Sequence, residues 1–385
     1  MSFKVVGIVT AAATAVTAAA TAATLKIALS RRPAMPDNPE LYTNPVPSDD
    51  ADNNPHELRA MFFGVSTIAL FDGETTLLTD GFFSRPSAQQ VLAGRVSPNH
   101  AAIDEALQKA GIGEAAAVLV AHSHYDHALD APAVCWRTGA TLVGSESTLN
   151  IGRGYGLGED QMKVADLEEP MTFGRFKVRL ILSEHSPHPK FQGFIEAPLR
   201  APARAKEYRM AQCYSFLITH TSATGRTRNV LIHASAGFRP DCLKGYRADV
   251  AFLGVGPLGK QSTEFRNDYW RETVEMVKAR RVIPIHWDDF TLPLSEPLQA
   301  MPYIADDFRV TLKFLQRRRS LDGIEFAIPE PFVKIDPFAT LGSSASAPSA
   351  CCGLANKLPP SRTAPINKTI PPQMERQVHM RIPFY

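Results

Sequence analysis

The chain has 385 residues, an apolar fraction of 44% and a formal net charge of +2 at pH 7. That apolar fraction is sufficient for a sizeable buried core, in one large domain or two smaller ones. A charge so close to zero argues against nucleic acid as the main partner, because phosphate contacts require a basic surface. The five cysteines (135, 213, 242, 351 and 352) form no Cys-x-x-Cys pair, so they support neither a disulfide framework nor a zinc ribbon.

The first thirty residues differ in composition from the rest of the chain. Residues 5–25 carry no charged side chain, Lys4 precedes them, and Lys26, Arg31 and Arg32 follow. At about 1.5 Å per residue, a helix of this length is long enough to cross a bilayer. We expect residues 1–30 to be a signal peptide or a membrane anchor and favour the cell envelope as the location. The alternative is an Ala-rich leader on a cytoplasmic protein.

Residues 31–57 are rich in Pro, Asp and Asn and are typical of a linker, and residues 338–385 are predicted to form a low-complexity tail. The folded domain is therefore expected over residues 58–337. Its first two strands, at 61–71 and 75–79, are joined by Asp72-Gly73, which favours a hairpin. Further strands are predicted at 115–121, 140–144, 178–184, 214–221, 228–234, 249–254 and 281–285, and helices at 101–110, before Gly139, and at 266–280. Strands and helices recur in two halves, which predicts two packed sheets with helices outside them.

Residues 122–127, with the sequence His-Ser-His-Tyr-Asp-His, are the most informative segment for function. They follow the apolar strand predicted at 115–121 and precede a helix start at Asp130-Ala-Pro-Ala. Imidazole nitrogen and carboxylate oxygen are donors that suit Zn²⁺, Fe and Mn. His122 and His124 lie two residues apart in an extended segment and so point the same way. The loop therefore predicts a metal site at the end of a strand.

This hexapeptide resembles the HxHxDH signature of the metallo-β-lactamase superfamily, and the remaining motifs occur in the expected order. Asp80, in Thr79-Asp80-Gly81, matches the first motif, whose Asp supports the ligand loop in that family. His185 and His286 each follow a predicted strand and match the third and last motifs. The resemblance implies an α/β fold, the αββα four-layer sandwich, over residues 58–337. Within the superfamily the chain looks closest to the ascorbate-6-phosphate lactonase-like and N-acyl-phosphatidylethanolamine phospholipase D-like branches.

The resemblance also implies two sets of metal ligands. The first set is His122, His124 and His185, and the second is Asp126, His127 and His286. Ser235 stands where many members have an Asp that bridges the two metals, and Ser is a poor ligand unless it is deprotonated. The cofactor is expected to be Zn²⁺, one ion or two, with Fe and Mn as alternatives.

Other histidines and carboxylates offer alternative roles. His188, three residues after His185, is an alternative ligand, and His233 at a strand end is interpreted as a hydrogen-bonded structural residue. Asp288 and Asp289 are interpreted as solvated loop carboxylates rather than as an acid/base pair.

The predicted activity is hydrolysis by a metal-bound hydroxide, since Zn²⁺ lowers the pKa of its bound water to about 7. Asp126 and Asp80 are the candidate catalytic residues, Asp126 as a ligand that orients the nucleophile and Asp80 as its support. The expected substrate is a small-molecule or lipid-derived ester, lactone or phosphodiester. Residues 187–209 contain Arg200, Arg204 and Lys206, and they are interpreted either as a flap that takes a phosphate or as an ordinary solvated loop. A non-catalytic metal sensor and an RNA-processing nuclease are the alternative functions.

Overall fold

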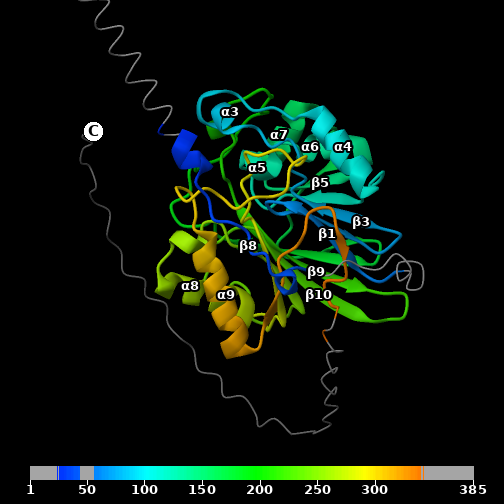
Figure 1. Ribbon diagram of the computed structural model, residues 1–385. Coiled ribbons are helices and arrows are strands. Elements are labelled where there is room, and N and C mark those ends of the chain that lie inside the picture. The colour runs from blue at the N-terminus through cyan, green and yellow to red at the C-terminus, as the bar shows by residue number, and fades with distance from the viewer. Residues whose placement is uncertain (1–23, 25, 44–55, 340, 342–385) are drawn as a thin grey trace, which may run out of the picture. The chain divides into compact units, whose positions relative to one another are not determined.

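The computed structural model describes residues 24, 26–43, 56–339 and 341. The predicted anchor at residues 5–25 and the predicted tail at 338–385 lie almost entirely outside these residues. Within the described part of the chain, no helix combines the length and the apolar character needed to cross a membrane. Two seven-stranded sheets form the centre of the domain (Figure 1).

The first sheet has the strand order β14-β1-β2-β3-β4-β5-β6. Its strands are β1 (Arg59–Gly64), β2 (Thr67–Phe71), β3 (Thr76–Thr79), β4 (Ala117–Leu119), β5 (Thr141–Gly144), β6 (Met162–Val164) and β14 (Lys334–Ile335). Strands β1, β2 and β3 pair antiparallel, whereas β3 to β6 are parallel. Because parallel strands share a carboxyl edge, the residues that follow β3 and β4 meet at one edge of this sheet.

The second sheet has the order β13-β12-β11-β10-β9-β8-β7. Its strands are β7 (Met171–Phe173), β8 (Phe176–Ser183), β9 (Cys213–Thr221), β10 (Thr227–His233), β11 (Val250–Gly254), β12 (Arg281–Ile285) and β13 (Glu325–Phe326). Strands β7 to β10 pair antiparallel and β10 to β13 are parallel. His185 follows β8 and His286 follows β12, so the candidate metal ligands of this sheet also lie just after strand ends.

Helices cover the outer face of each sheet (Figure 1). The helices after the strands of the first sheet are α3 (Ala88–Ala93), α4 (His100–Ala110), α5 (Tyr125–Ala128), α6 (Ala131–Thr138) and α7 (Glu146–Tyr155). Helices α8 (Thr263–Trp270) and α9 (Phe308–Asp322) belong to the second. The helix predicted at 266–280 begins earlier, at the N-cap Ser262, and continues beyond Trp270 as a π-helical turn, Arg271–Glu275.

Two apolar cores establish the four layers. Phe62 packs between the two sheets with Phe176, Phe216 and Phe252, whereas its neighbour Phe63 packs between the first sheet and its helices. Successive residues of a strand point to opposite faces, so β1 contributes to both cores. Each fully buried Phe stabilises the fold by about 1.5–3 kcal/mol. The αββα sandwich predicted from the sequence is confirmed.

Part of the segment predicted as a linker contacts this domain. The guanidinium of Arg32 forms an ion pair of 2.9 Å with Asp289, and Tyr42 pairs with Ile328 in an isolated bridge. Leu41 is buried in the core between the sheets. Residues 31–43 therefore lie against the domain, and residues 44–55 lie outside the described part of the chain.

Candidate metal centre

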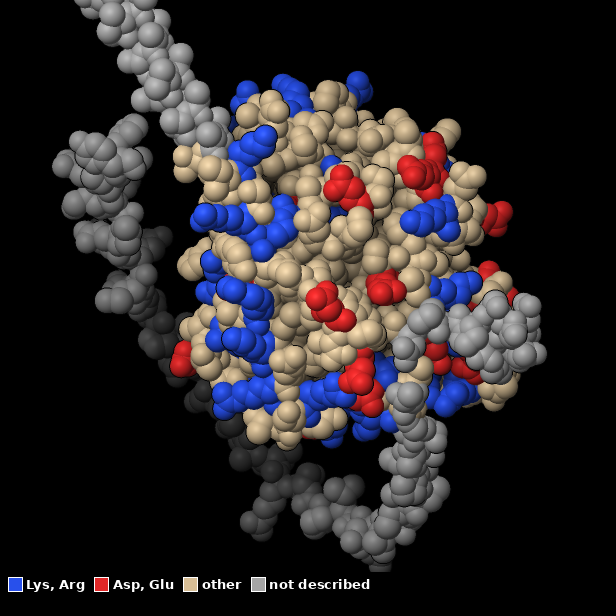
Figure 2. Space-filling model, viewed as in Figure 1, with Lys and Arg blue, Asp and Glu red and all other residues tan. Residues whose placement is uncertain are grey.

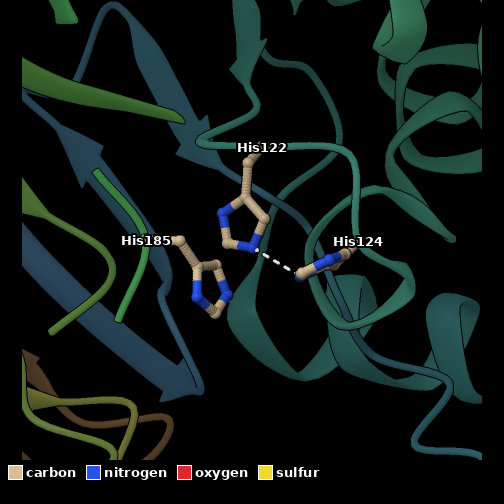
Figure 3. Close-up of side chains that lie close together, drawn as sticks. All are labelled: His122, His124 and His185. Atoms are coloured by element: carbon tan, nitrogen blue, oxygen red, sulfur yellow. Dashed lines mark hydrogen bonds between the residues drawn. The ribbon is translucent and has the colours of Figure 1, made fainter. Parts of the chain in front are cut away.

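The loop between β4 and α5 places its ligands at the carboxyl edge of the first sheet. His122 and His124 lie in the loop itself, and Asp126 and His127 lie in the single turn of α5. His185 approaches from the end of β8, as Figure 3 shows. The structure thus brings together histidines that lie 63 residues apart in the sequence.

The first ligand set consists of three imidazoles whose ring centres lie 4.8–5.0 Å apart. His124 Nε2 donates to the Lys190 carbonyl at 2.9 Å, and His185 Nδ1 lies 3.1 Å from the Ser186 carbonyl. A carbonyl only accepts, so these bonds leave His124 Nδ1 and His185 Nε2 with free lone pairs. His124 Nδ1 faces His122 Nε2 at 3.1 Å. These three nitrogens converge on one point, as a metal ion requires.

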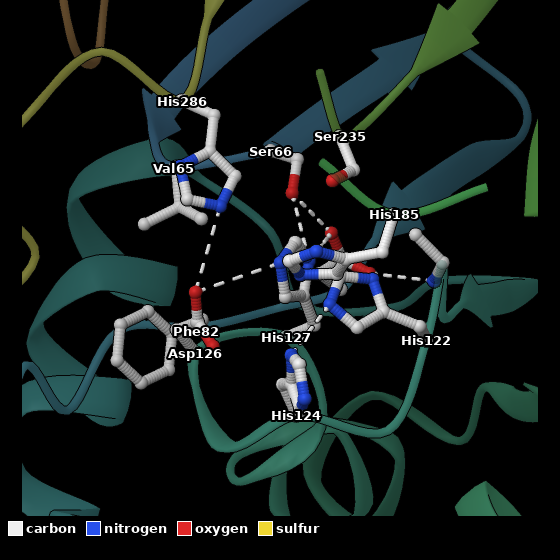
Figure 4. A network of polar contacts seen from close by, with 12 residues as sticks. Val65, Ser66, Phe82, His122, His124, Asp126, His127, His185, Ser235 and His286 are labelled. Atoms are coloured by element: carbon white, nitrogen blue, oxygen red, sulfur yellow. Dashed lines mark hydrogen bonds and ion pairs between the residues drawn. The ribbon is translucent and has the colours of Figure 1, made fainter. Parts of the chain in front are cut away.

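The second ligand set lies beside the first (Figure 4). Asp126 Oδ2 is 3.6 Å from His127 Nε2 and 3.5 Å from His286 Nε2. The ligand atoms within each set lie within 4.8 Å of one another. The rings of His122 and His127 are 3.9 Å apart between centres, so the two sets are neighbours.

Asp80 supports both parts of the ligand loop. Its Oδ1 accepts from the backbone N–H of Ala121 at 2.8 Å, next to His122. Its Oδ2 lies 2.8 Å from His127 Nδ1 and accepts from the Ser66 hydroxyl at 2.5 Å. A hydrogen bond from His127 Nδ1 to this carboxylate leaves Nε2 free for a metal. Sequence reasoning missed Ser66, which lies in the turn between β1 and β2 and ahead of the Asp80 motif.

An unpaired buried atom indicates that the site suits a metal. Nε2 of His127, which faces Asp126 in the second set, is buried without a hydrogen-bond partner among the described residues. Burial, and then the neighbouring imidazole of His124, lowers the pKa of His185 to about 3. Burial and the other histidines also lower the pKa of His122 well below its usual range. Neutral imidazoles are the form that binds metals, so the donor set fits a divalent cation.

Ser235 lines the same pocket, but its hydroxyl contacts the backbone. The Oγ accepts from the Ser186 N–H at 3.0 Å, and this bond positions the segment that carries His185. In Figure 4 its side chain lies on the His185 side of the network. Its predicted role as a ligand stays a prediction.

The alternative residues separate clearly. His188 is exposed and belongs to neither ligand set. His233 is buried, with Nε2 donating to the Gly237 carbonyl at 2.6 Å, which fits the structural role expected for it. The interpretation of Asp288 and Asp289 as solvated loop carboxylates is wrong. Both carboxylates are buried. The guanidinium of Arg85 pairs with Asp288 at 2.7 Å, and that of Arg32 pairs with Asp289 at 2.9 Å.

Asp288 holds the backbone that carries His286. Its Oδ1 accepts from the Val65 N–H at 2.8 Å, and the Val65 carbonyl accepts from the His286 N–H at 2.6 Å. His286, Val65 and Asp80 all have positive φ, at 58°, 50° and 56°. Such conformations cost free energy and persist where surrounding bonds fix them, typically at functional sites.

A pocket of about 740 Å³ opens above the ligands. Its walls combine apolar side chains, among them Val91, Phe290 and Met301, with the basic side chains of Arg204 and Lys206. These two basic residues belong to the predicted flap, whereas Arg200 does not line the pocket. The flap interpretation therefore applies to part of residues 187–209.

Sequence comparison finds relatives among metal-dependent hydrolases. A UPF0173 metal-dependent hydrolase from Heliobacterium modesticaldum is 26% identical over 237 residues, which cover 60% of this chain and 84% of the relative. One from Staphylococcus aureus (strain Newman) is 23% identical over 242 residues, 63% of this chain and 91% of the relative. No family model matches the chain.

Solved structures were compared as well. A metallo hydrolase from Ignicoccus hospitalis has a TM-score of 0.43 at 17% identity, covering 72% of this chain and 98% of its own. A possible metal-dependent hydrolase from Veillonella parvula has a TM-score of 0.45 at 15% identity, covering 73% and 99%. At these scores the structural matches do not add to the argument.

The relatives do not distinguish the two branches named from the motifs, and the branch stays a prediction. The sandwich, the two converging ligand sets and the hydrolase relatives agree at the level of the superfamily. The chain shares the motifs and the sandwich expected of the metallo-β-lactamase superfamily, and the curated relatives it resembles are metal-dependent hydrolases.

Proposed function

We propose that this hydrolase binds two Zn²⁺ ions and cleaves an ester, lactone or phosphodiester bond in a substrate with an anionic group and an apolar portion. The observation that carries the substrate class is the pocket above the ligands, which is lined by both basic and apolar side chains. Its volume of about 740 Å³ falls in the range usual for small-molecule sites, roughly 300–1,000 Å³.

Two ions are favoured because each set offers three donors without sharing one. His122, His124 and His185 would hold the first ion, and Asp126, His127 and His286 the second. A bound divalent cation supplies Lewis acidity and activates water near neutral pH. Ser235 in place of a carboxylate removes a bridging charge, so we expect the second ion to bind more weakly than the first.

The chain's own residues orient both ends of the reaction. Asp80 and Ser66 fix the ring of His127, and the Lys190 carbonyl fixes that of His124, so the donors are arranged before a metal binds. Lys190, Arg204 and Lys206 offer cations to a phosphate or carboxylate of the substrate.

The apolar wall completes the binding surface. Phe290 lies against both His286 and Tyr125, with ring centres 5.7 and 6.3 Å apart. Met301 and Val91 line the same pocket. An acyl chain or aromatic group placed there would lose contact with water and hold the scissile bond near the metal ligands.

The first experiment measures metal content by elemental analysis of the full chain and of the His122→Ala and Asp126→Ala variants. We expect close to two equivalents of zinc in the parent chain and a loss in each variant. One equivalent that disappears only with His122→Ala would contradict the two-ion proposal. Absence of stoichiometric metal would contradict the centre itself.

The second experiment tests the substrate class with nitrophenyl substrates of graded charge and chain length. Decyl p-nitrophenyl phosphate should exceed methyl p-nitrophenyl phosphate in kcat/KM, and p-nitrophenyl butyrate serves as the uncharged ester. Lys206→Ala should raise KM for the anionic substrates about 3- to 10-fold, as expected for a partly exposed charged contact. Arg200→Ala, an exposed cation outside the pocket, is the matched control. Equal turnover of all three substrates would refute the proposed substrate class. Absence of turnover in a protein that has bound its metal would favour a metal sensor.

A further inference from the structure

The mouth of the active-site pocket carries large apolar side chains that face solvent. Leu92 and Ile304 both line the pocket, yet their exposed fractions are 64% and 62%. Leu92 lies in α3, a helix in which no residue is buried. Exposed aliphatic residues are ordinary when scattered, but here two of them lie at the entrance of one cavity.

Basic side chains lie at the same entrance. Lys190, Arg204 and Lys206 line the pocket and are exposed. Of the described residues that line it, the one carboxylate is Asp126, which belongs to the second ligand set. The entrance is therefore positive as well as apolar. Figure 2 shows a further gathering of Lys and Arg down the side of the molecule where α8 and α9 lie in Figure 1, although neither helix lines the pocket.

The N-terminal segment enters the domain beside this entrance. Residues 26–30 are helical, and the Arg31 carbonyl accepts from the Tyr303 N–H at 2.9 Å, next to Ile304. Arg32 then pairs with Asp289, the neighbour of the pocket residue Phe290. Residues 31 and 32, which follow the uncharged stretch 5–25 in the sequence, therefore contact the domain beside Ile304.

We propose that the pocket mouth docks on the surface of an anionic phospholipid bilayer, with Leu92 and Ile304 inserted among the lipid chains. Peripheral binding of this kind requires an apolar insertion together with basic residues near the headgroups, and the mouth supplies both. The uncharged stretch that leads into residues 26–32 favours a membrane over a second protein as the occupant. The proposal concerns where the enzyme works and does not depend on which bond it cleaves.

The test uses the full-length chain and vesicles whose phospholipid chains are brominated, because bromine quenches tryptophan emission on contact. The variants are Leu92→Trp and Ile304→Trp. Both positions are exposed, so the larger side chain needs no space in the core. Trp136, with an exposed fraction of 67%, is the internal reference. Trp136 lies far from the metal ligands. The residues that follow it, Arg137 and Thr138, line a hollow together with Gly174, at the turn where β8 begins. His185 follows the other end of β8.

We expect the added emission of both variants to fall at least two-fold on brominated phosphatidylglycerol vesicles, with Trp136 unaffected in the parent chain. Reversal of the rim charges in an Arg204→Glu and Lys206→Glu double variant should weaken vesicle binding at least ten-fold. Lys177→Glu, an exposed cation at the far end of β8, is the matched control.

Three results would overturn the proposal: no vesicle binding, equal binding to phosphatidylcholine, or binding without quenching of either added tryptophan. The last result would mean that the N-terminal stretch alone tethers the protein. Metal content measured on every variant verifies that the fold is retained. Since no step of this test requires turnover, its failure leaves the proposed hydrolysis unaffected.

Discussion

Asp80→Asn tests how the ligand loop is held together. In the structure Asp80 accepts three hydrogen bonds, from the Ala121 N–H, the Ser66 hydroxyl and His127 Nδ1. An asparagine of the same shape offers one acceptor oxygen and two N–H donors. If the oxygen remains on Ala121, the amide nitrogen faces His127. The imidazole must then accept at Nδ1 and carry its proton on Nε2, the atom that faces Asp126.

Asp80→Asn should lower the metal affinity mainly of the second ligand set. Loss of a partner that orients a ligating histidine typically lowers metal affinity about 10- to 100-fold, or about 1.4–2.7 kcal/mol. The first set keeps the contact between residue 80 and the Ala121 N–H beside His122, so its metal affinity should change by less than about 3-fold. Ser66→Ala removes one donor but leaves the carboxylate, so its effect on the second site should be near 3-fold.

The assay is a two-site Zn²⁺ titration in competition with a chromophoric chelator, with circular dichroism to verify the fold. Asp80→Asn should weaken the looser site and leave the tighter one nearly unchanged. The reasoning is refuted if Asp80→Asn and Ser66→Ala behave alike, or if the tighter site is the one that weakens.

The remaining predictions concern stability. Asp306 is buried with neither carboxylate oxygen hydrogen-bonded among the described residues, and burial raises its pKa to about 7. Since the unfolded carboxyl titrates near 3.8, its contribution to stability is present below that pH and is lost as pH rises through 7, by about 4 kcal/mol at most. Urea unfolding should therefore show Asp306→Asn more stable than the parent at pH 8, and a gain that does not shrink toward pH 4 would contradict the assignment. Gly64→Ala would place a Cβ against the Arg85 guanidinium at a φ of +105°, and disruption of the buried ion pair between Arg85 and Asp288 should cost about 3–5 kcal/mol, measured as a lower Tm. An unchanged Tm would mean that this ion pair can move aside.

The sequence was most informative where ligands are close together in the chain. The hexapeptide 122–127 contains four donors, and His185 and His286 each follow an apolar strand in the order the superfamily requires. Strand ends were predictable because apolar runs and turn residues are local signals. The same reasoning failed at Asp288, since its partner Arg85 lies 203 residues earlier and no local pattern links them.

By itself, then, the sequence determined the fold class, the donor types and the order in which they follow their strands. Only the tertiary structure decided which nitrogen of His124, His185 and His127 is free, because the Lys190 and Ser186 carbonyls and Asp80 fix the other one. It also decided that basic and apolar side chains line one pocket, and that Leu92 and Ile304 in this pocket are exposed. These features arise from contacts between residues far apart in the chain, and such contacts form only when both sheets and the loops between them pack together.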